Sequence, residues 1–185
     1  MDTLILIDAV NAVPEGFRAD LREVGGIFLE KTAAGRCLEM LRAARYEGID
    51  IKPVSGYRSR EYQQVLWNRE LVRHLSAGLC YDEAVRLTGR YLARVGHSEH
   101  ETGLAVDFCL PDDDDADETF SATSQGRWLA ENAHGFGFIL RYPRMKESIT
   151  GIAYEPWHFR YTGLPHSSLM KENGLTLEEY LYYYR

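Results

Sequence analysis

Residues 98–107 read Ser-Glu-His-Glu-Thr-Gly-Leu-Ala-Val-Asp, a polar, histidine-bearing segment that leads directly into an apolar run. The pattern predicts a strand over residues 104–110. Side chains alternate along a strand, so Asp107 points away from the face that carries Val106 and Phe108. Burying a carboxylate without a partner is costly. We therefore expect a positive group to face Asp107, either an arginine or lysine side chain or a metal ion.

Two further polar clusters are Ser55-Gly56-Tyr57-Arg58-Ser59 and Glu155-Pro156-Trp157-His158. Proline disfavours a helix interior, so the second cluster is expected in a kinked strand. Its histidine joins His100 and Asp107 in a set of two imidazoles and one carboxylate. Such a set leaves a fourth tetrahedral position for water, which is typical of catalytic zinc.

Glu155 lies three residues before His158 and is placed to take a proton from a zinc-activated water. Its alternative role is to support His158 or to pair with an arginine. Two histidines and one carboxylate also form the facial triad of non-haem iron(II) oxygenases. Those enzymes generally need a larger jelly-roll sheet, and this chain has too few predicted strands, so hydrolysis is the favoured chemistry.

The rest of the chain alternates between helical and strand patterns, with no repeat and no linker. The expected elements are a helix over 30–47, a strand over 49–54, a helix capped by Ser59, a helix over 82–94, an acidic loop over 112–118, a helix from Ser124 to Gly135, strands over 136–142 and 152–161, a helix over 165–174 and a last helix with a Thr176–Glu179 capping box. This order predicts one α+β domain over residues 1–185, with a small antiparallel sheet.

Composition excludes several classes of protein. The 185 residues are 45% hydrophobic and 26% charged, as in an ordinary globular domain. A formal charge of -7 argues against nucleic-acid binding. Cys37, Cys80 and Cys109 form no C-x-x-C pair and are expected to be buried, reduced thiols. We expect no membrane insertion and a cytoplasmic location, because no signal or membrane-spanning segment is visible.

Taken together, S-G-Y-R-S, S-E-H-E-T-G-L-A-V-D and E-P-W-H-F-R-Y resemble motifs of the zinc D-alanyl-D-alanine carboxypeptidases of the VanY type and of their VanX and VanXY relatives. The resemblance extends from about Pro53 to Glu179 and includes W-L-x-E-N-A-H-x-x-G-F from Trp128 to Phe138 and I-T-G-I from Ile149 to Ile152. It implies a small α+β domain with a central antiparallel sheet flanked by helices, as in hedgehog and D,D-peptidase folds.

The resemblance also implies site residues. One Zn²⁺ per chain would be held by His100, Asp107 and His158. Glu155 would be the general base, and Arg58 would bind substrate and stabilise the oxyanion. Gln63, Ser98 and Trp157 complete the expected substrate contacts, with Trp157 as a wall of the site. Three other histidines are expected in other roles: His97 in an exposed loop, and His134 and His166 in capping or packing.

The implied activity is removal of C-terminal D-Ala from the D-Ala-D-Ala dipeptide or from a peptidoglycan precursor that ends in D-Ala-D-Ala. The ending P-H-S-x-x-M-x-E-N-G-x-x-x-E-E-Y, from Pro165 to Tyr180, fits the VanXY type best. The choice between dipeptidase and carboxypeptidase stays open. Two alternatives are a phage endolysin-type L-Ala-D-Glu peptidase and a non-catalytic, hedgehog-like zinc-binding domain. We expect a monomer or a weak dimer.

Overall fold

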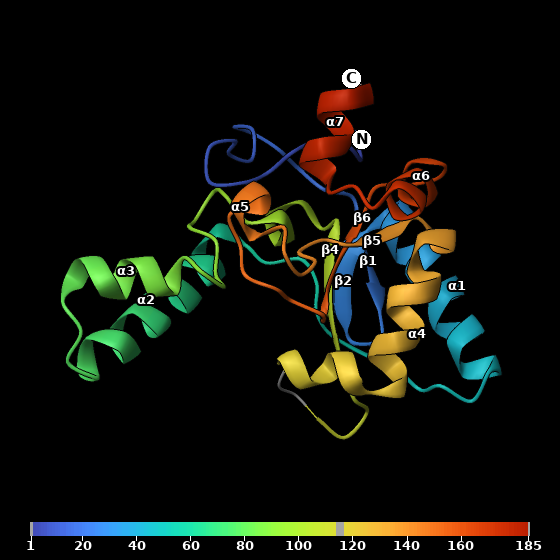
Figure 1. Ribbon diagram of the computed structural model, residues 1–185, viewed down its shortest axis with the longest axis horizontal. Coiled ribbons are helices and arrows are strands. Elements are labelled where there is room, and N and C mark those ends of the chain that lie inside the picture. The colour runs from blue at the N-terminus through green and yellow to red at the C-terminus, as the bar shows by residue number, and fades with distance from the viewer. Residues whose placement is uncertain (1, 114–116, 185) are drawn as a thin grey trace.

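The chain folds around a four-stranded antiparallel sheet, seen in a computed structural model that describes residues 2–113 and 117–184 (Figure 1). In spatial order the strands are β3 (Lys52–Ser55), β4 (Ala105–Cys109), β6 (His158–Tyr161) and β5 (Phe138–Leu140). A separate antiparallel hairpin consists of β1 (Leu21–Val24) and β2 (Ile27–Glu30).

Helices surround this sheet. They are α1 (Lys31–Tyr46), α2 (Arg60–Ser76), α3 (Tyr81–Thr88), α4 (Ser124–Asn132), α5 (Glu147–Thr150), α6 (His166–Asn173) and α7 (Leu177–Tyr184). Side-chain caps fix where the first two begin. The Glu30 carboxylate accepts from the amides of Thr32 and Ala33 at the start of α1. The Ser59 hydroxyl accepts from the amide of Tyr62 at the start of α2, which confirms the expected cap.

The apolar core lies between the sheet and the helices α1 and α4. Val106 and Phe108 of β4 are fully buried in this core, together with Cys37 of α1 and Leu129 of α4. Ala105 and Cys109, which share the strand face of Asp107, are buried but lie outside this cluster, as the alternation predicts. The fold is therefore the predicted α+β class, with a central antiparallel sheet flanked by helices.

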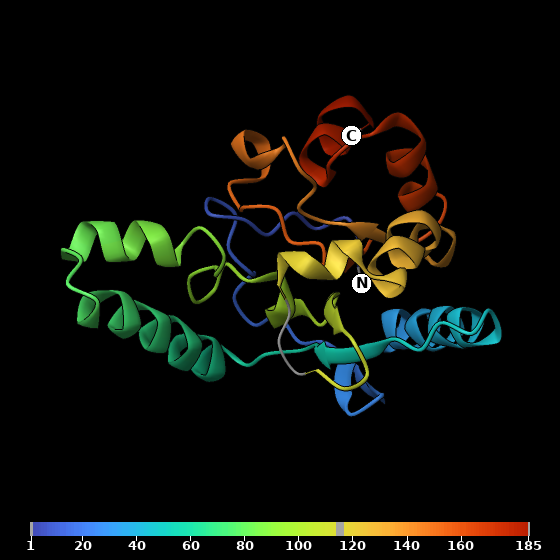
Figure 2. The ribbon, with the colours of Figure 1, turned by 60° about the horizontal axis from the view of Figure 1, so that its bottom comes forward.

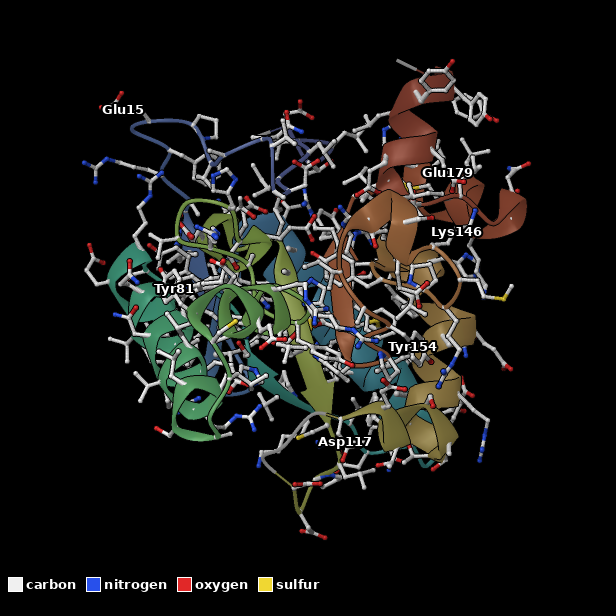
Figure 3. The ribbon with its side chains drawn as sticks, turned by 60° about the vertical axis from the view of Figure 1, so that its left-hand side comes forward. Glu15, Tyr81, Asp117, Lys146, Tyr154 and Glu179 are labelled. Carbon is white, nitrogen blue, oxygen red and sulfur yellow. The ribbon has the colours of Figure 1, made fainter. Side chains whose placement is uncertain are left out.

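The helices are unevenly distributed around the sheet. Figures 1 and 2 show α1 and α4 on one side of the molecule, whereas α2 and α3 form a hairpin that projects from the opposite side. Helices α6 and α7 pack on a second apolar cluster that includes Ile139, Met170 and Leu177. Lys146 and Glu179 lie side by side near α7 in Figure 3, with Nζ 2.7 Å from the carboxylate.

The capping box at the start of α7 is confirmed. The Thr176 amide donates to Glu179 Oε2 at 2.8 Å, and the Glu179 amide donates to Thr176 Oγ1 at 3.3 Å. His166 contacts Tyr180, with Nδ1 2.8 Å from the hydroxyl, so this histidine has the expected packing role. His134 Nδ1 lies 3.4 Å from Ser168 Oγ, a contact between its turn and α6.

The expected strand over 152–161 is wrong in its first half, because β6 begins only at His158. Pro156 has no amide proton to donate to a strand ladder. The Glu155 amide instead donates to the carbonyl of Tyr142 at 3.2 Å, and the His158 amide turns back to the carbonyl of Glu155. The segment before β6 is therefore a turn that carries Glu155, and the predicted kinked strand does not form there.

Other boundaries also differ from expectation. Helix α3 ends at Thr88, before the predicted end at Arg94, and Gly89 follows as its cap. Helix α4 is capped by Thr123, whose hydroxyl accepts from Gly126, and the expected cap Ser124 is its first residue. The β1–β2 hairpin was not predicted. Residues 114–116 of the predicted acidic loop lie outside the described residues.

Two further expectations concern single side chains. Cys37 and Cys109 are buried, but Cys80 is exposed, because it stands at the start of the projecting helix α3. His97 is half-buried rather than exposed, because its Nδ1 lies 2.7 Å from the carbonyl of Asp8. Among the described residues, no helix is both long and apolar enough to cross a bilayer.

Candidate active site

The register of the sheet brings Asp107 and His158 together. Asp107 of β4 pairs with His158 of β6 on one side and with Ser55 of β3 on the other. Directly opposed residues in an antiparallel pair place their side chains on the same face. The result is a distance of 2.9 Å between Asp107 Oδ1 and His158 Nδ1. Both side chains are buried, on the face of the sheet opposite the apolar core.

His100 reaches the same point from a short helical turn, Glu99–Thr102, that Gly103 ends at a φ of 72°. Its Nδ1 lies 2.7 Å from the carbonyl of Gly56, which only accepts, so Nδ1 carries the proton. The other ring nitrogen, Nε2, therefore presents its lone pair 3.2 Å from Asp107 Oδ2. Position 56 requires glycine, because a Cβ there would collide with the carbonyl oxygen of Phe28.

Within the described part of the chain, His100, Asp107 and His158 each offer one ligand atom within 4.8 Å of the other two. Burial and the nearby charge of Arg58 lower the pKa of His100, so its imidazole is in the neutral form that binds metals. Burial alone would raise the pKa of Asp107, but the two imidazoles hold it well below its usual range. Two imidazole nitrogens and an ionised carboxylate fit Zn²⁺.

The carboxylate of Glu99 faces the ring nitrogen of His158 that points away from Asp107, a contact that sequence analysis missed. Its Oε2 lies 3.5 Å from His158 Nε2, and its Oε1 lies 2.7 Å from Arg141 Nε and 2.8 Å from Arg160 Nη1. Burial alone would raise the pKa of Glu99, but the two arginines hold it far below its usual range. The ionised carboxylate favours a proton on His158 Nε2 and leaves Nδ1 facing Asp107.

The surroundings of His158 stabilise positive charge. Burial alone would lower the pKa of this imidazole, but its hydrogen bond to Asp107 and the nearby carboxylate of Glu99 raise that pKa to about 9. The carboxylates of Asp107 and Glu99 are thus arranged around a point where a cation is favoured. A divalent metal ion at the three ligand atoms would satisfy the same preference.

Arg58 also faces Asp107. Its Nη2 lies 2.7 Å from Asp107 Oδ2, while Nε and Nη2 donate to Ser55 Oγ at 2.9 and 2.7 Å. Of the two alternatives expected opposite Asp107, the arginine partner is therefore present, at the edge of the group that could hold the metal ion. The arginine stands at the edge of the ligand group, where its remaining donors can reach a substrate oxygen.

Glu155 lies beside the ligand group, with Oε2 3.8 Å from His158 Nδ1. Burial raises the pKa of Glu155 to about 8, partly opposed by the neighbouring His158. A carboxyl group whose pKa is near neutrality can both accept and return a proton, which suits general acid–base chemistry. Its carboxylate stands outside the set of three ligand atoms.

These side chains line a small cavity of about 120 Å³. Ser98 and Trp157 are part of its wall, and so is Tyr142, whose ring lies 4.9 Å from that of His158. Gln63 is placed differently. It is fully buried, does not line this cavity, and donates from Nε2 to the carbonyl of Ala93 at 2.7 Å. Gln63 thus supports the wall segment that contains Ala93 instead of facing the cavity.

Known proteins resemble this chain over the segments that carry the site. Residues 26–164 match the profile of the VanY family, described as D-alanyl-D-alanine carboxypeptidase. The chain is 41% identical over 154 residues to the putative carboxypeptidase YodJ of Bacillus subtilis (strain 168), which covers 83% of this chain and 53% of YodJ. It is 40% identical over 157 residues to VanXYC of Enterococcus gallinarum, a bifunctional D-Ala-D-Ala dipeptidase and D-Ala-D-Ala carboxypeptidase, with coverage of 83% and 77%.

A solved structure shares almost the whole fold. It is a variant of the vancomycin-resistance D,D-pentapeptidase VanY from a VanB-type cassette, in complex with Zn(II). The TM-score is 0.89 at 33% identity, with 98% of this chain and 99% of that chain covered. The chain spans about half the length of YodJ, so the likeness to that protein concerns the part that contains the described site.

Proposed function

This chain belongs to the VanY family of D-alanyl-D-alanine carboxypeptidases, and we propose that it is a zinc-dependent peptidase that releases D-Ala from substrates ending in D-Ala-D-Ala. The observation that supports this proposal best is the buried group of His100, Asp107 and His158, with Glu155 beside it in the same cavity. A non-catalytic zinc domain has no need of a buried carboxyl group with a raised pKa at that position.

The three ligand residues would hold the ion through His100 Nε2, a carboxylate oxygen of Asp107 and His158 Nδ1. Zn²⁺, when bound, supplies Lewis-acid chemistry, since it lowers the pKa of water and polarises a carbonyl oxygen. Two groups outside the set of ligands determine which nitrogen of each imidazole faces the ion. Gly56 fixes the tautomer of His100, and Glu99 fixes that of His158.

Glu155 moves the proton in this mechanism. Its carboxylate takes a proton from the attacking water, whose oxygen forms the new bond to the carbonyl carbon of the scissile D-Ala-D-Ala bond. The C–N bond then breaks, and Glu155 returns the proton to the nitrogen of the departing D-Ala. Burial keeps this carboxyl group away from bulk water, so that it exchanges its proton with the substrate.

Arg58 stabilises the negative charge that develops on the carbonyl oxygen. Its guanidinium is held by Ser55 Oγ and directed at the ligand group, so little rearrangement is needed during the reaction. Ser98 and Trp157 border the cavity and shape the space for the terminal residues. We propose Gln63 as a substrate determinant that acts through the wall at Ala93.

The test is mass spectrometry of D-Ala release by the purified protein, with and without a chelator. Four substrates are compared: the D-Ala-D-Ala dipeptide, an N-acetylated peptide ending in D-Ala-D-Ala, a peptide ending in an L-residue followed by D-Ala, and a muropeptide with an L-Ala-D-Glu bond. We expect chelator-sensitive release from one or both D-Ala-D-Ala substrates, which also separates dipeptidase from carboxypeptidase. Cleavage confined to the other two substrates, or no cleavage, would contradict the proposal.

A further inference from the structure

We propose that a groove next to the catalytic cavity binds an anionic group, a carboxylate or a phosphate, carried by substrates longer than the dipeptide. This inference rests on the proposed peptidase function and adds a substrate class to it. The groove has a volume of about 380 Å³ and lies where the α2–α3 hairpin meets the body of the protein. We call it the arginine groove, because Arg58, Arg69, Arg73 and Arg90 line it.

The arginine groove adjoins the catalytic cavity. Arg58, Tyr91 and Leu92 line both spaces. The cavity itself, at about 120 Å³, is much the smaller of the two. A substrate with several residues before the scissile bond must therefore extend out of the cavity, and the arginine groove begins at the cavity wall.

The charge of the groove is opposite to that of the chain. The protein has a formal charge of -7, yet among the groove-lining residues Glu70 is the carboxylate and four are arginines. Glu70 is already engaged by Arg73, at distances between 2.5 and 3.0 Å. Within the described part of the chain, neither Arg69 nor Arg90 forms an ion pair, and both are exposed to solvent.

The base of the groove is held in place before any ligand arrives. The Ala153 amide donates to the carbonyl of Arg90 at 2.9 Å, and Gln63 holds the carbonyl of Ala93. The Arg90 guanidinium lies 5.6 Å from the centre of the Tyr91 ring, which restricts its orientations. Leu66 adds an apolar surface next to these cations.

These features suit an oxyanion on an otherwise apolar or peptide-like chain. Guanidinium groups bind carboxylates and phosphates through paired N–H donors, and they form stronger hydrogen bonds with charged than with neutral acceptors. The amide of a glutamine offers the same shape without the charge. A substrate pair that differs only in this respect isolates the contribution of the groove.

The experiment measures kcat/KM for three N-acetylated peptides ending in D-Ala-D-Ala. The first has a glutamate side chain upstream, the second has glutamine at that position, and the third is the glutamine peptide with a phosphoryl group at its N-terminal end. Two exposed arginines predict a preference of about threefold to tenfold for an anionic peptide over the neutral one. The preference should shrink at high salt, because screening weakens exposed charge pairs.

Two double variants complete the design. Arg69→Gln with Arg90→Gln should lower the preference toward onefold. Lys31→Gln with Arg42→Gln removes the same charge from exposed positions on α1, at the opposite end of the molecule (Figure 1), and should keep the preference. A preference for the glutamate peptide, for the phosphoryl peptide or for both supports the proposal and identifies the anion.

Equal kcat/KM for all three peptides, or a preference that the α1 variant loses equally, would overturn the anion site while leaving the peptidase assignment intact. If the unaltered protein released D-Ala from none of these four substrates, the three peptides and the dipeptide, the proposed function on which this inference rests would be overturned instead.

Discussion

Replacing Glu99 by glutamine tests whether the buried carboxylate positions His158. The substitution keeps the size of the side chain but removes its charge from between Arg141 and Arg160, which are both fully buried. Arg141 keeps Glu178, whose oxygens accept at 2.7 and 3.0 Å, whereas Arg160 keeps the carbonyl groups to which it donates. Breaking a buried ion pair costs about 3–5 kcal/mol of unfolding free energy. Because the amide oxygen of glutamine can still accept from an arginine, we expect a loss near the lower end of this range, about 3 kcal/mol.

Glu99→Gln should also weaken the binding of Zn²⁺. Loss of a carboxylate behind a ligating histidine lowers metal affinity by about 10–100-fold. Stability is measured by denaturant unfolding of the metal-free protein, and zinc affinity by competition with a chromophoric chelator. A loss of about 3 kcal/mol corresponds to a fall in Tm of roughly 6–12 °C for a chain of this size.

A matched control separates positioning from stability. Glu101 is a buried carboxylate in the same turn, with Oε2 3.3 Å from Arg60 Nε and Oε1 accepting from the amide of Gly96. Glu101→Gln should lower stability and leave zinc affinity unchanged, because Glu101 does not contact His158. Unchanged zinc affinity in Glu99→Gln, or an equal loss in both variants, would refute the positioning role.

Three more outcomes are expected. Arg58→Ala should retain zinc and lower kcat by about 10²–10³-fold, as does the loss of an oxyanion donor, and Arg58→Lys should recover part of this loss. If the alanine variant turned over at the rate of the unaltered protein, the role of Arg58 would be structural. Gly56→Ala should destabilise the fold by about 1–3 kcal/mol in denaturant unfolding, because the added Cβ meets the Phe28 carbonyl oxygen. Gly35→Ala on α1 is the control and should be neutral or stabilising, because no atom lies within 4 Å of its added Cβ. The difference in unfolding free energy between the unaltered protein and Glu99→Gln should be complete at pH 7 and shrink as the pH falls below about 4.5. The reason is that the pKa of Glu99 is depressed in the folded state, whereas the carboxylate of the unfolded chain takes up protons in this range. A difference that is constant down to pH 3 would contradict this.

The direction of the Asp107 side chain could be predicted from the sequence because a short-range rule, the alternation of side chains along a strand, governs it. Alternation along β4 places Asp107 opposite the core, and antiparallel pairing with β6 is enough to bring His158 beside it. Burial of a carboxylate in an apolar strand signals a positive partner without any knowledge of the fold. The caps at Ser59 and Thr176 are likewise local, because they depend on residues within one helical turn.

The features that sequence analysis missed depend on contacts between distant segments. Glu99 is meaningful only because Arg141 and Arg160, which lie on or next to other strands, converge on it. The strand expected from Ile152 fails because the Glu155 amide bonds to the carbonyl of Tyr142. Gln63 is buried under Ala93, a placement that helix periodicity cannot reveal because it follows from the packing of a later segment.

In the proposed mechanism, Glu155 performs the proton transfers without holding the metal. Zinc content and D-Ala release, measured on one preparation of Glu155→Gln, test this role. The amide keeps the size of the side chain and removes the basic group. The mechanism predicts one zinc per chain and a D-Ala release rate lower by about 10²–10⁴-fold or more, because both proton transfers fail. Loss of zinc, or turnover at the rate of the unaltered protein, would contradict it.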